Sequence, residues 1–303
     1  MRYIITGGTG LIGTALAEKL LQNGAEVILL SRNPGKYSDS IPKGARLKDW
    51  DGKTVNGWGE LVNADSGIIN LAGANLSAGR WTTSRKREIM DSRTNAGQAV
   101  VQAVVQASKK PQVVLQSSAV GYYGSRGDKI ITESTSAGSD FASRVTIAWE
   151  ESTKAVEAFD VRRVIIRTGV VLSTTGGAFP QMLLPFRLFA GGPIANGKQW
   201  FPWIHLKDTV AAIHYLLENQ QATGVFNLSA PYPVQNRELA KAIGKQIHRP
   251  SLLPVPGFAL KMLFGEMSTI LLASQRIIPQ NLIDLGYKFQ FPKVESALEN
   301  IFR

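Results

Sequence analysis

The fold is decided by the stretch Tyr3-Ile-Ile-Thr-Gly-Gly-Thr-Gly-Leu-Ile-Gly13, near the start of the sequence. The apolar run Arg2-Tyr-Ile-Ile-Thr6 is continuous and ends at glycines, which predicts a short buried strand. Leu11 to Gln22 carries apolar residues on one side and is followed by Gly24, which predicts a helix that ends there. The sequence therefore begins with a strand, a glycine-rich turn and a helix.

The glycine-rich turn has the spacing G-x-x-G-x-x-G, with glycines at positions 7, 10 and 13. Glycines let the backbone turn tightly and approach a pyrophosphate, and the helix N-terminus adds free N–H groups and a partial positive charge. Glycines alone would also mark a simple tight turn, but here the strand, the spacing and the helix occur together. We therefore expect a dinucleotide to contact Gly7, Thr9, Gly10, Leu11, Ile12 and Gly13.

The type of dinucleotide depends on the residues after the second predicted strand, Glu26 to Leu30. Proteins that bind NAD usually have Asp or Glu there, about 20 residues beyond the glycines. This sequence has Ser31-Arg32-Asn33 instead, and no acid occurs before Asp39. Arg32 can pair with a 2′-phosphate and Ser31 can donate a hydrogen bond to it; the alternative is that Arg32 is only an exposed loop residue. The sequence favours NADP(H) over NAD(H).

Strands alternate with helices through the first half of the chain, which predicts an α/β fold. Further buried strands are expected at Gly67 to Leu71, Gln112 to Gln116 and Arg163 to Ile166, and helices at Ser84 to Ser108 and Asp140 to Phe159. We therefore expect a Rossmann-type, doubly wound parallel sheet. Residues 1–170 would form the NADP-binding domain, with later strands returning to it.

The pattern changes after about residue 170, where turn-rich segments and prolines become frequent. Expected elements are strands at Trp200 to His205 and Val225 to Leu228, helices at Lys207 to Asn219 and Asn236 to Ile247, and a helical C-terminal extension. Residues 171–303 are therefore expected to form a smaller α/β substrate lobe. Ligands of such folds bind at the carboxyl ends of the strands, between the lobes.

Composition argues against several classes of protein. The 303 residues include no cysteine and three histidines, so no metal site is expected. The net charge is +11, but Lys and Arg are scattered, so nucleic acid is not an expected partner. The apolar segment Gly257 to Ser274 contains Lys261 and Glu266, which favours a packed helix over a membrane span. With no signal peptide expected, we predict a soluble, cytoplasmic protein with a small-molecule substrate and no membrane partner; its oligomeric state is left open.

Several further segments match one family when taken together with the glycine turn. They are Asn70-Leu-Ala-Gly73, Arg80-Trp-Thr82, Ser117-Ser-Ala-Val-Gly-Tyr-Tyr-Gly124, Arg167-Thr-Gly-Val-Val-Leu172, Gly191-Gly-Pro193, Trp200-Phe-Pro-Trp-Ile-His205 and Leu271-Leu-Ala-Ser-Gln-Arg276. The chain resembles the short-chain dehydrogenase/reductase superfamily in its extended, epimerase-like form. More closely, it resembles the atypical subgroup called the NAD-dependent epimerase/dehydratase-like family with a short C-terminal extension.

This resemblance implies further contacts with the cofactor. Near the adenine and its ribose it implies Leu71, Ala72, Gly73 and Asp51, although Asp51 can equally be a surface turn residue. Near the nicotinamide it implies Ser117, Thr168, Gly169 and Val170.

The superfamily's usual catalytic pair is absent. That pair is a Tyr followed four residues later by a Lys, on the helix after the fifth strand, and it passes a proton during hydride transfer. No Tyr here has Lys at that spacing, and the helix that begins near Asp140 has neither residue at its start. The atypical subgroup lacks the pair too. The candidate proton donors are Ser117, Ser118, Tyr122, Tyr123 and His205, each of which can instead have a structural role.

The substrate lobe and its surroundings supply the candidate substrate contacts. These are Trp81, Arg93, Trp200, Trp203 and Arg276, although tryptophans are more often core residues and Arg276 can simply cap a helix. The leading hypothesis is an NADP(H)-dependent oxidoreductase or nucleotide-sugar-epimerase-like enzyme. The alternative, favoured by the missing pair, is a non-catalytic NADP(H)-binding sensor or regulatory protein.

Overall fold

The computed structural model describes all residues from 1 to 303. Seven strands form its central sheet: β1 (Arg2–Thr6), β2 (Glu26–Ser31), β3 (Arg46–Asp49), β4 (Ser66–Asn70), β5 (Val113–Ala119), β7 (Arg162–Thr168) and β11 (Gly224–Leu228). They pair in the order β11-β7-β5-β4-β1-β2-β3, and all six pairings are parallel. This arrangement confirms the predicted Rossmann-type, doubly wound fold.

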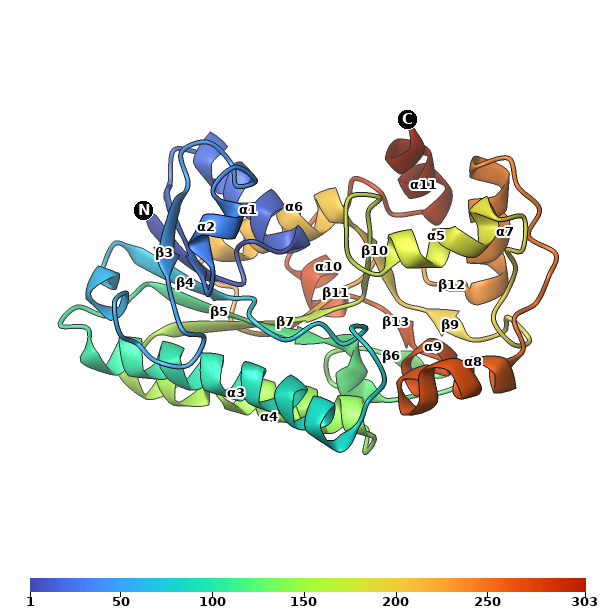
Figure 1. The fold of residues 1–303 in the computed structure, drawn as a ribbon. Helices are drawn as coiled ribbons and strands as arrows, with labels where there is room; N and C mark the ends of the chain where they lie inside the picture. The colour runs from blue at the N-terminus through green and yellow to red at the C-terminus, as the bar shows by residue number, and fades with distance from the viewer.

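Helices cover both faces of the sheet, and its inner strands, such as β1 and β4, are buried (Figure 1). One face carries α1 (Leu11–Gln22) and α6 (Leu206–Glu218), whose side chains Leu16 and Ile213 share one core. The other face carries α3 (Thr83–Gln106) and α4 (Phe141–Glu151), and Val100 of α3 lies in a second core. The carboxyl ends of the strands are left uncovered by these helices and can hold a ligand.

The first predicted strand and helix match the structure at both ends, but the predicted helix from Asp140 to Phe159 is divided. It forms α4 and then a 3-10 helix, Lys154–Phe159. The division occurs where Arg163 of β7 donates to the carbonyl of Glu150 and to Oγ1 of Thr153. A tertiary contact therefore takes a carbonyl that a longer α-helix would have used itself.

The last strand of the sheet comes from the second half of the chain. β11 pairs with β7, and α6 packs against α1. Short segments also connect the two halves: β6 (Ile130–Ile131) pairs with β13 (Arg276–Ile277). The chain beyond residue 170 therefore contributes both to the central sheet and to a separate lobe.

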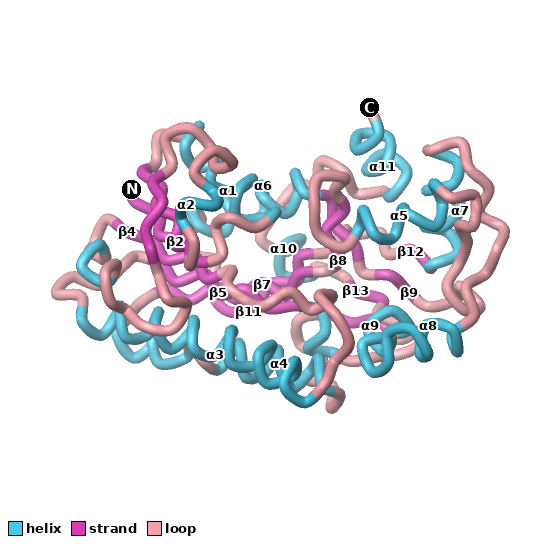
Figure 2. Tube along the Cα trace, in the orientation of Figure 1, coloured by secondary structure: helices cyan, strands magenta, loops and turns pink.

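That lobe is built from small sheets and short helices (Figure 2). Its helices are α5 (Phe179–Arg187), α7 (Asn236–Gln246), α8 (Gly257–Phe264), α9 (Ser268–Leu272) and α11 (Val294–Phe302). The short helices α2 (Pro34–Tyr37) and α10 (Gln280–Asp284) belong to the sheet domain, where Leu282 of α10 lies in the same core as Leu16 and Ile213. The predicted strand from Trp200 to His205 is two strands, β9 (Trp200–Phe201) and β10 (Trp203–His205). Pro202 separates them, because it has no N–H to donate to a ladder.

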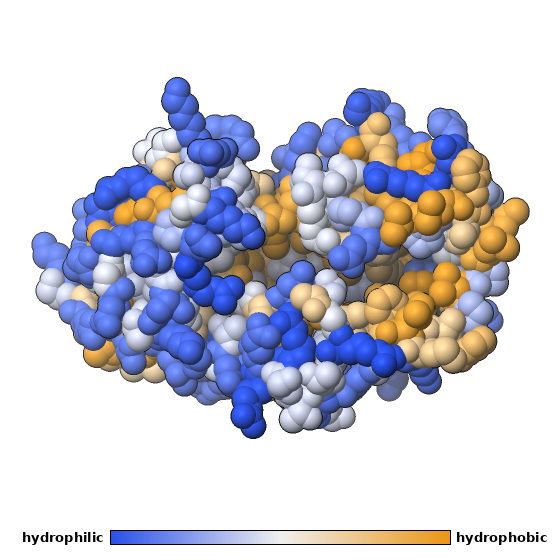
Figure 3. All heavy atoms as spheres, viewed as in Figure 1, coloured by the Kyte–Doolittle hydropathy of each residue, from blue (hydrophilic) through white to orange (hydrophobic).

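The two short strands pair in different directions. β9 is antiparallel to β12 (Val234–Gln235), and β10 is parallel to β8 (Val170–Leu172). The face of the molecule is hollowed between the sheet domain and the lobe, and hydrophobic side chains gather over α5 and α8 (Figure 3). No helix is both long and apolar enough to cross a membrane.

Candidate functional site

The glycine turn is packed directly against the loop after β4. Gly7 has φ +66°, and a Cβ there would lie 2.8 Å from the backbone carbonyl group of Leu71. A Cβ on Gly13 would lie 2.6 Å from the carbonyl oxygen of Gly7. Gly10 precedes α1 as its N-cap and makes no side-chain cap bond. The glycine turn therefore brings backbone N–H groups and the positive end of α1 to the carboxyl edge of the sheet.

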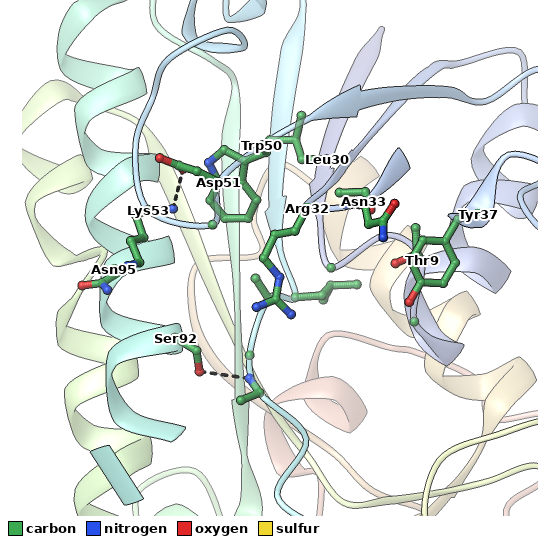
Figure 4. A pocket seen from close by; sticks show the side chains of 18 of the residues that line it. Thr9, Leu30, Arg32, Asn33, Tyr37, Trp50, Asp51, Lys53, Ser92 and Asn95 are labelled. Atoms are coloured by element: carbon green, nitrogen blue, oxygen red, sulfur yellow. Dashed lines mark hydrogen bonds between the residues drawn. The ribbon is translucent and has the colours of Figure 1, made fainter. Parts of the chain in front are cut away.

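A cavity of about 790 Å³ opens beside this turn (Figure 4). It is lined by the ends of β1, β2, β3 and β4, by α2 and by the middle of α3. Of the predicted cofactor contacts, its walls include Gly7, Thr9, Gly10, Ser31, Arg32, Asp51, Leu71, Ala72 and Gly73. Leu11, Ile12 and Gly13 begin α1 behind the turn, while Ser117, Thr168, Gly169 and Val170 lie further along the edge, on β5, on β8 and at the end of β7.

Three cationic residues, Arg32, Lys36 and Lys53, are among those that line the cavity. Of these, Arg32 was predicted from the sequence, whereas Lys36 and Lys53 were not. Lys36 is four residues beyond Arg32 in the one-turn helix α2, a spacing that could have indicated it. Lys53 comes from the loop after β3, which only the parallel pairing of β2 and β3 brings alongside. These charges favour an anionic ligand group.

Asp51 also lines the cavity, but its carboxylate is bound by its own turn. Oδ1 accepts hydrogen bonds from the backbone N–H groups of Lys53 and Thr54, both at 2.8 Å, and Oδ2 accepts one from the Thr54 hydroxyl. The hydrogen bonds from Thr54 and Lys53 hold the pKa of Asp51 below its usual value. The carboxylate thus orders the 51–54 loop that carries Lys53.

A chain of polar side chains crosses three strands at the same edge of the sheet. Thr6 of β1 donates to Asn70 of β4 at 2.6 Å, and Asn70 donates to Gln116 of β5 at 2.8 Å. Gln116 in turn donates to the carbonyl of Ser117 at 2.6 Å. This chain aligns the carboxyl ends of three adjacent strands, from the glycine turn to the predicted proton donors.

A second, fully buried network lies beyond Ser117. Arg167 forms a two-point ion pair with Glu150 of α4, and Glu150 also accepts a hydrogen bond from Ser118 at 2.6 Å. Tyr123 donates to Asn227 at 2.7 Å and accepts from Arg167 at 3.1 Å. Burial raises the pKa of Tyr123 to about 12. Ser118 and Tyr123 are therefore engaged inside the protein, which argues against the predicted catalytic role of both.

Comparison with known proteins adds to this geometry. Residues 3–229 match the model of the NAD-dependent epimerase/dehydratase family, and residues 255–301 match a domain of unknown function, DUF1731. The chain belongs to the NAD-dependent epimerase/dehydratase family. The epimerase family protein YfhF of Bacillus subtilis is 37% identical over 99% of this chain and 98% of its own length. The mouse epimerase family protein SDR39U1 is 35% identical over 99% of both chains.

Solved structures agree with this assignment. The human epimerase family protein SDR39U1 (isoform 2), solved with NADPH, has a TM-score of 0.90 and 33% identity, covering 100% of this chain and 99% of that one. A nucleoside-diphosphate sugar epimerase from Corynebacterium glutamicum has a TM-score of 0.78 and 31% identity, covering 100% of this chain and 58% of that one.

Two predicted proton donors, Ser117 and Tyr122, have hydroxyl groups that form no hydrogen bond in this buried network. Ser117 lies on β5 beside Ile166 of β7, where the strand ends meet. Tyr122 is half-buried, and the Arg167 guanidinium carbon lies 3.3 Å from the centre of its ring. The epimerase-family site therefore offers one serine and one tyrosine hydroxyl near the carboxyl ends of β5 and β7.

His205 makes structural contacts that argue against its predicted role as a proton donor. Its Nδ1 accepts a hydrogen bond from the backbone N–H of Lys207 and caps α6, and its ring stacks on Phe291 with centroids 4.2 Å apart. Burial, together with the nearby charge of Lys207, lowers the pKa of His205 to about 4. The imidazole is therefore neutral near pH 7 and packed in the fold.

Two of the five predicted substrate contacts, Trp81 and Trp203, lie in the core. Trp203 is fully buried in the core of the lobe, and Trp81 packs edge-on against Phe141 with its indole N–H bonded to Leu76; both predictions are corrected to core roles. Trp200 stacks with Arg276, whose guanidinium carbon lies 4.5 Å from the ring centre. Arg93 lies under the loop after β4, against Gly73. No cluster of His, Asp or Glu is arranged to bind a metal ion.

Proposed function

We propose that the protein is an NADP(H)-dependent oxidoreductase of the epimerase-like type, acting on a small polar substrate. One observation carries this proposal: the glycine turn and the three cations Arg32, Lys36 and Lys53 line one cavity at the carboxyl edge of the sheet. A Cβ on Gly7 would collide with Leu71, so the turn has the close backbone packing that a bound pyrophosphate needs. The human relative solved with NADPH supports the choice of cofactor.

Each group of the cavity has a distinct role in this proposal. The backbone N–H groups of the turn hold the pyrophosphate, the three cations hold the 2′-phosphate, and Leu71 to Gly73 border the ribose. The bound nicotinamide supplies hydride transfer. Ser117 and Tyr122 orient the substrate and exchange a proton with its oxygen, where charge changes during the reaction.

Cofactor choice is tested by measuring the affinities of NADPH and NADH by calorimetry. Arg32→Ala should weaken NADPH binding roughly tenfold or more, because a charge-assisted hydrogen bond is lost, and should leave NADH nearly unchanged. The control is Arg87→Ala, which removes an exposed arginine from α3. Equal affinities of the wild-type protein for the two cofactors would contradict the proposal.

The second candidate is a non-catalytic NADP(H) sensor, which is favoured by the engagement of Ser118 and Tyr123 in the buried network. The two functions are separated with NADPH carrying deuterium at C4, incubated with a metabolite extract. An enzyme transfers the label to a small molecule and loses this ability in the double variant Ser117→Ala, Tyr122→Phe. A sensor binds the same cofactor tightly, and no label leaves it.

A further inference from the structure

Large hydrophobic side chains are concentrated on one part of the surface of the lobe. Fourteen such side chains are exposed in the whole molecule, and eight of them belong to α5 and the residues just after it, to the loop before α8, or to α8. Single exposed hydrophobic side chains are ordinary, but a concentration of them marks a surface that binds another body. These eight residues, called the apolar face below, are Leu184, Leu188, Phe189, Leu252, Leu253, Phe258, Met262 and Leu263, with exposed fractions from 56% to 80%.

Backbone contacts join the two halves of the apolar face. The N–H of Leu253 donates to the carbonyl of Gly191, just beyond α5, at 3.3 Å, and the N–H of Ala195 donates to the carbonyl of Val255 at 2.9 Å. A Cβ on Gly192 would collide with the carbonyl group of Leu253, so a glycine is needed for this close approach. Hydrophobic side chains gather over both α5 and α8, on the face that is hollowed between the sheet domain and the lobe (Figure 3).

Helix α8 contributes little to the core of the protein. The sequence predicted a packed helix within Gly257 to Ser274, but the structure divides this segment, and Leu260 is the only buried residue of α8. The C-terminal end of α8 is held by polar contacts instead, because Arg80 from the loop after β4 donates to the carbonyls of Met262 and Leu263. The helix is therefore fixed in place while most of its large apolar side chains face outward.

The charge around the apolar face is positive. No acidic residue occurs at positions 161–207 or 239–265, the two stretches of sequence that contain the face. Arg187, Arg249 and Lys261 are exposed in these stretches, and none of them is paired with a carboxylate. A surface that combines apolar side chains with unpaired cations is complementary to a partner that is both apolar and anionic.

We propose that the apolar face docks on a membrane surface that contains anionic lipids. Phe258 and Met262 would enter the boundary between head groups and acyl chains, while Arg187, Arg249 and Lys261 would lie at the anionic head groups. The sequence prediction of no membrane partner considered only a membrane span, and this contact needs none. No residue of the face lines the cofactor cavity, so the inference does not depend on the proposed function.

Two features favour a lipid surface over a protein partner. The apolar side chains project individually, as Leu252 does with 80% of its surface exposed. Lipids conform to such a surface, whereas a protein would need a matching hollow for each side chain. The other feature is the charge: in a two-fold symmetric dimer of this chain, the exposed cations Arg187, Arg249 and Lys261 would face the same cations of the other copy.

Flotation with vesicles tests the proposal. The full-length protein is mixed with vesicles of phosphatidylcholine alone, or with vesicles of equal parts phosphatidylcholine and phosphatidylglycerol. We expect the protein to float with the mixed vesicles and hardly at all with the neutral ones, and we expect binding to weaken as salt is added, because salt screens surface charges. No flotation with the mixed vesicles, or equal flotation with both kinds, would overturn the proposal.

Variants of the apolar face test which residues make the contact. The double variant Phe258→Ser, Met262→Ser should bind the mixed vesicles roughly tenfold more weakly or less, because two apolar side chains no longer enter the lipid. Lys261→Gln should weaken binding about fivefold. Val105→Ser and Lys109→Gln are the matched controls, since both residues are exposed at the end of α3, and they should bind as wild type does. Equal losses in the controls would show that the apolar face is not the contact.

Sedimentation of the protein without vesicles distinguishes lipid binding from self-association. If wild type is a dimer and the double variant is a monomer, the apolar face is a contact between copies of the chain and the proposal is wrong. If both sediment alike and melt at the same temperature, the loss of flotation comes from the lost lipid contact. NADPH affinity should be the same in both, and a wild-type protein that floats without binding NADPH would contradict only the proposed function.

Discussion

Arg167 and Glu150 meet in two parallel hydrogen bonds, Nε to Oε1 and Nη2 to Oε2, both of 2.8 Å. The pair joins β7 to α4 beneath the carboxyl edge of the sheet, and Ser118 and Tyr123 are attached to it. Because both charges are buried, this contact positions the end of β5, which carries Ser117, and the 3-10 helix Val120–Tyr123 after it, which carries Tyr122.

Removal of one partner should be strongly destabilising. Glu150→Ala leaves Arg167 buried and unpaired, and we expect a loss of about 3–5 kcal/mol in the free energy of unfolding, measured with urea. Glu157→Ala is the matched control, because Glu157 pairs with Arg163 but is itself half-exposed, and its loss should cost about 1 kcal/mol or less. If Glu150→Ala and Glu157→Ala lowered the free energy of unfolding by similar amounts, burial of the Arg167–Glu150 pair would have no energetic consequence.

Two glycines of the turn should respond differently to substitution. Gly10→Val should abolish NADPH binding and leave unfolding nearly unchanged, because a Cβ there meets only the Gly7 carbonyl oxygen at 3.3 Å. Gly13→Ala should destabilise the protein by about 1–3 kcal/mol, since its Cβ would lie 2.6 Å from backbone atoms. Calorimetry with NADPH and urea unfolding measure both effects. Retained NADPH affinity in Gly10→Val would place the pyrophosphate elsewhere.

The adjacent tyrosines should separate into a structural and a functional residue. Tyr123→Phe removes the donor to Asn227 and an acceptor for Arg167, so we expect a loss of about 1–3 kcal/mol in unfolding free energy. Tyr122→Phe should cost about 0.5 kcal/mol or less but should reduce deuterium transfer from labelled NADPH. The opposite distribution, with stability lost in Tyr122→Phe, would exchange the roles assigned to the two residues.

The lowered pKa of His205 predicts that the stability of the protein depends on pH. Its pKa is about 4 in the folded protein, below the value of about 6.5 for an unperturbed histidine, so the unfolded state binds the proton more tightly. Its contribution is therefore fully present above about pH 6.5 and is lost progressively as the pH falls toward 4, by roughly 3 kcal/mol. His205→Asn keeps a capping side chain. In this variant the free energy of unfolding should change less with pH between about 4 and 6.5 than in wild type. His248→Asn, at an exposed position, serves as the control and should leave the slope unchanged.

Local pattern in the sequence was enough to predict β1, the glycine turn and α1, because these elements depend on residues close together in the chain. The fold class followed from the same alternation of strands and helices. The missing Tyr and Lys pair was also evident from the sequence, because it is a question of spacing alone.

Only the tertiary structure decided which polar side chains are engaged inside the fold and which can contact a ligand. Tyr122 and Tyr123 are neighbours in the sequence, yet Tyr123 is engaged by Asn227, which lies 104 positions further along the chain. His205 is packed against Phe291, and Lys53 reaches the cavity through strand pairing. Burial and long-range pairing set these chemical states, and no local spacing encodes them.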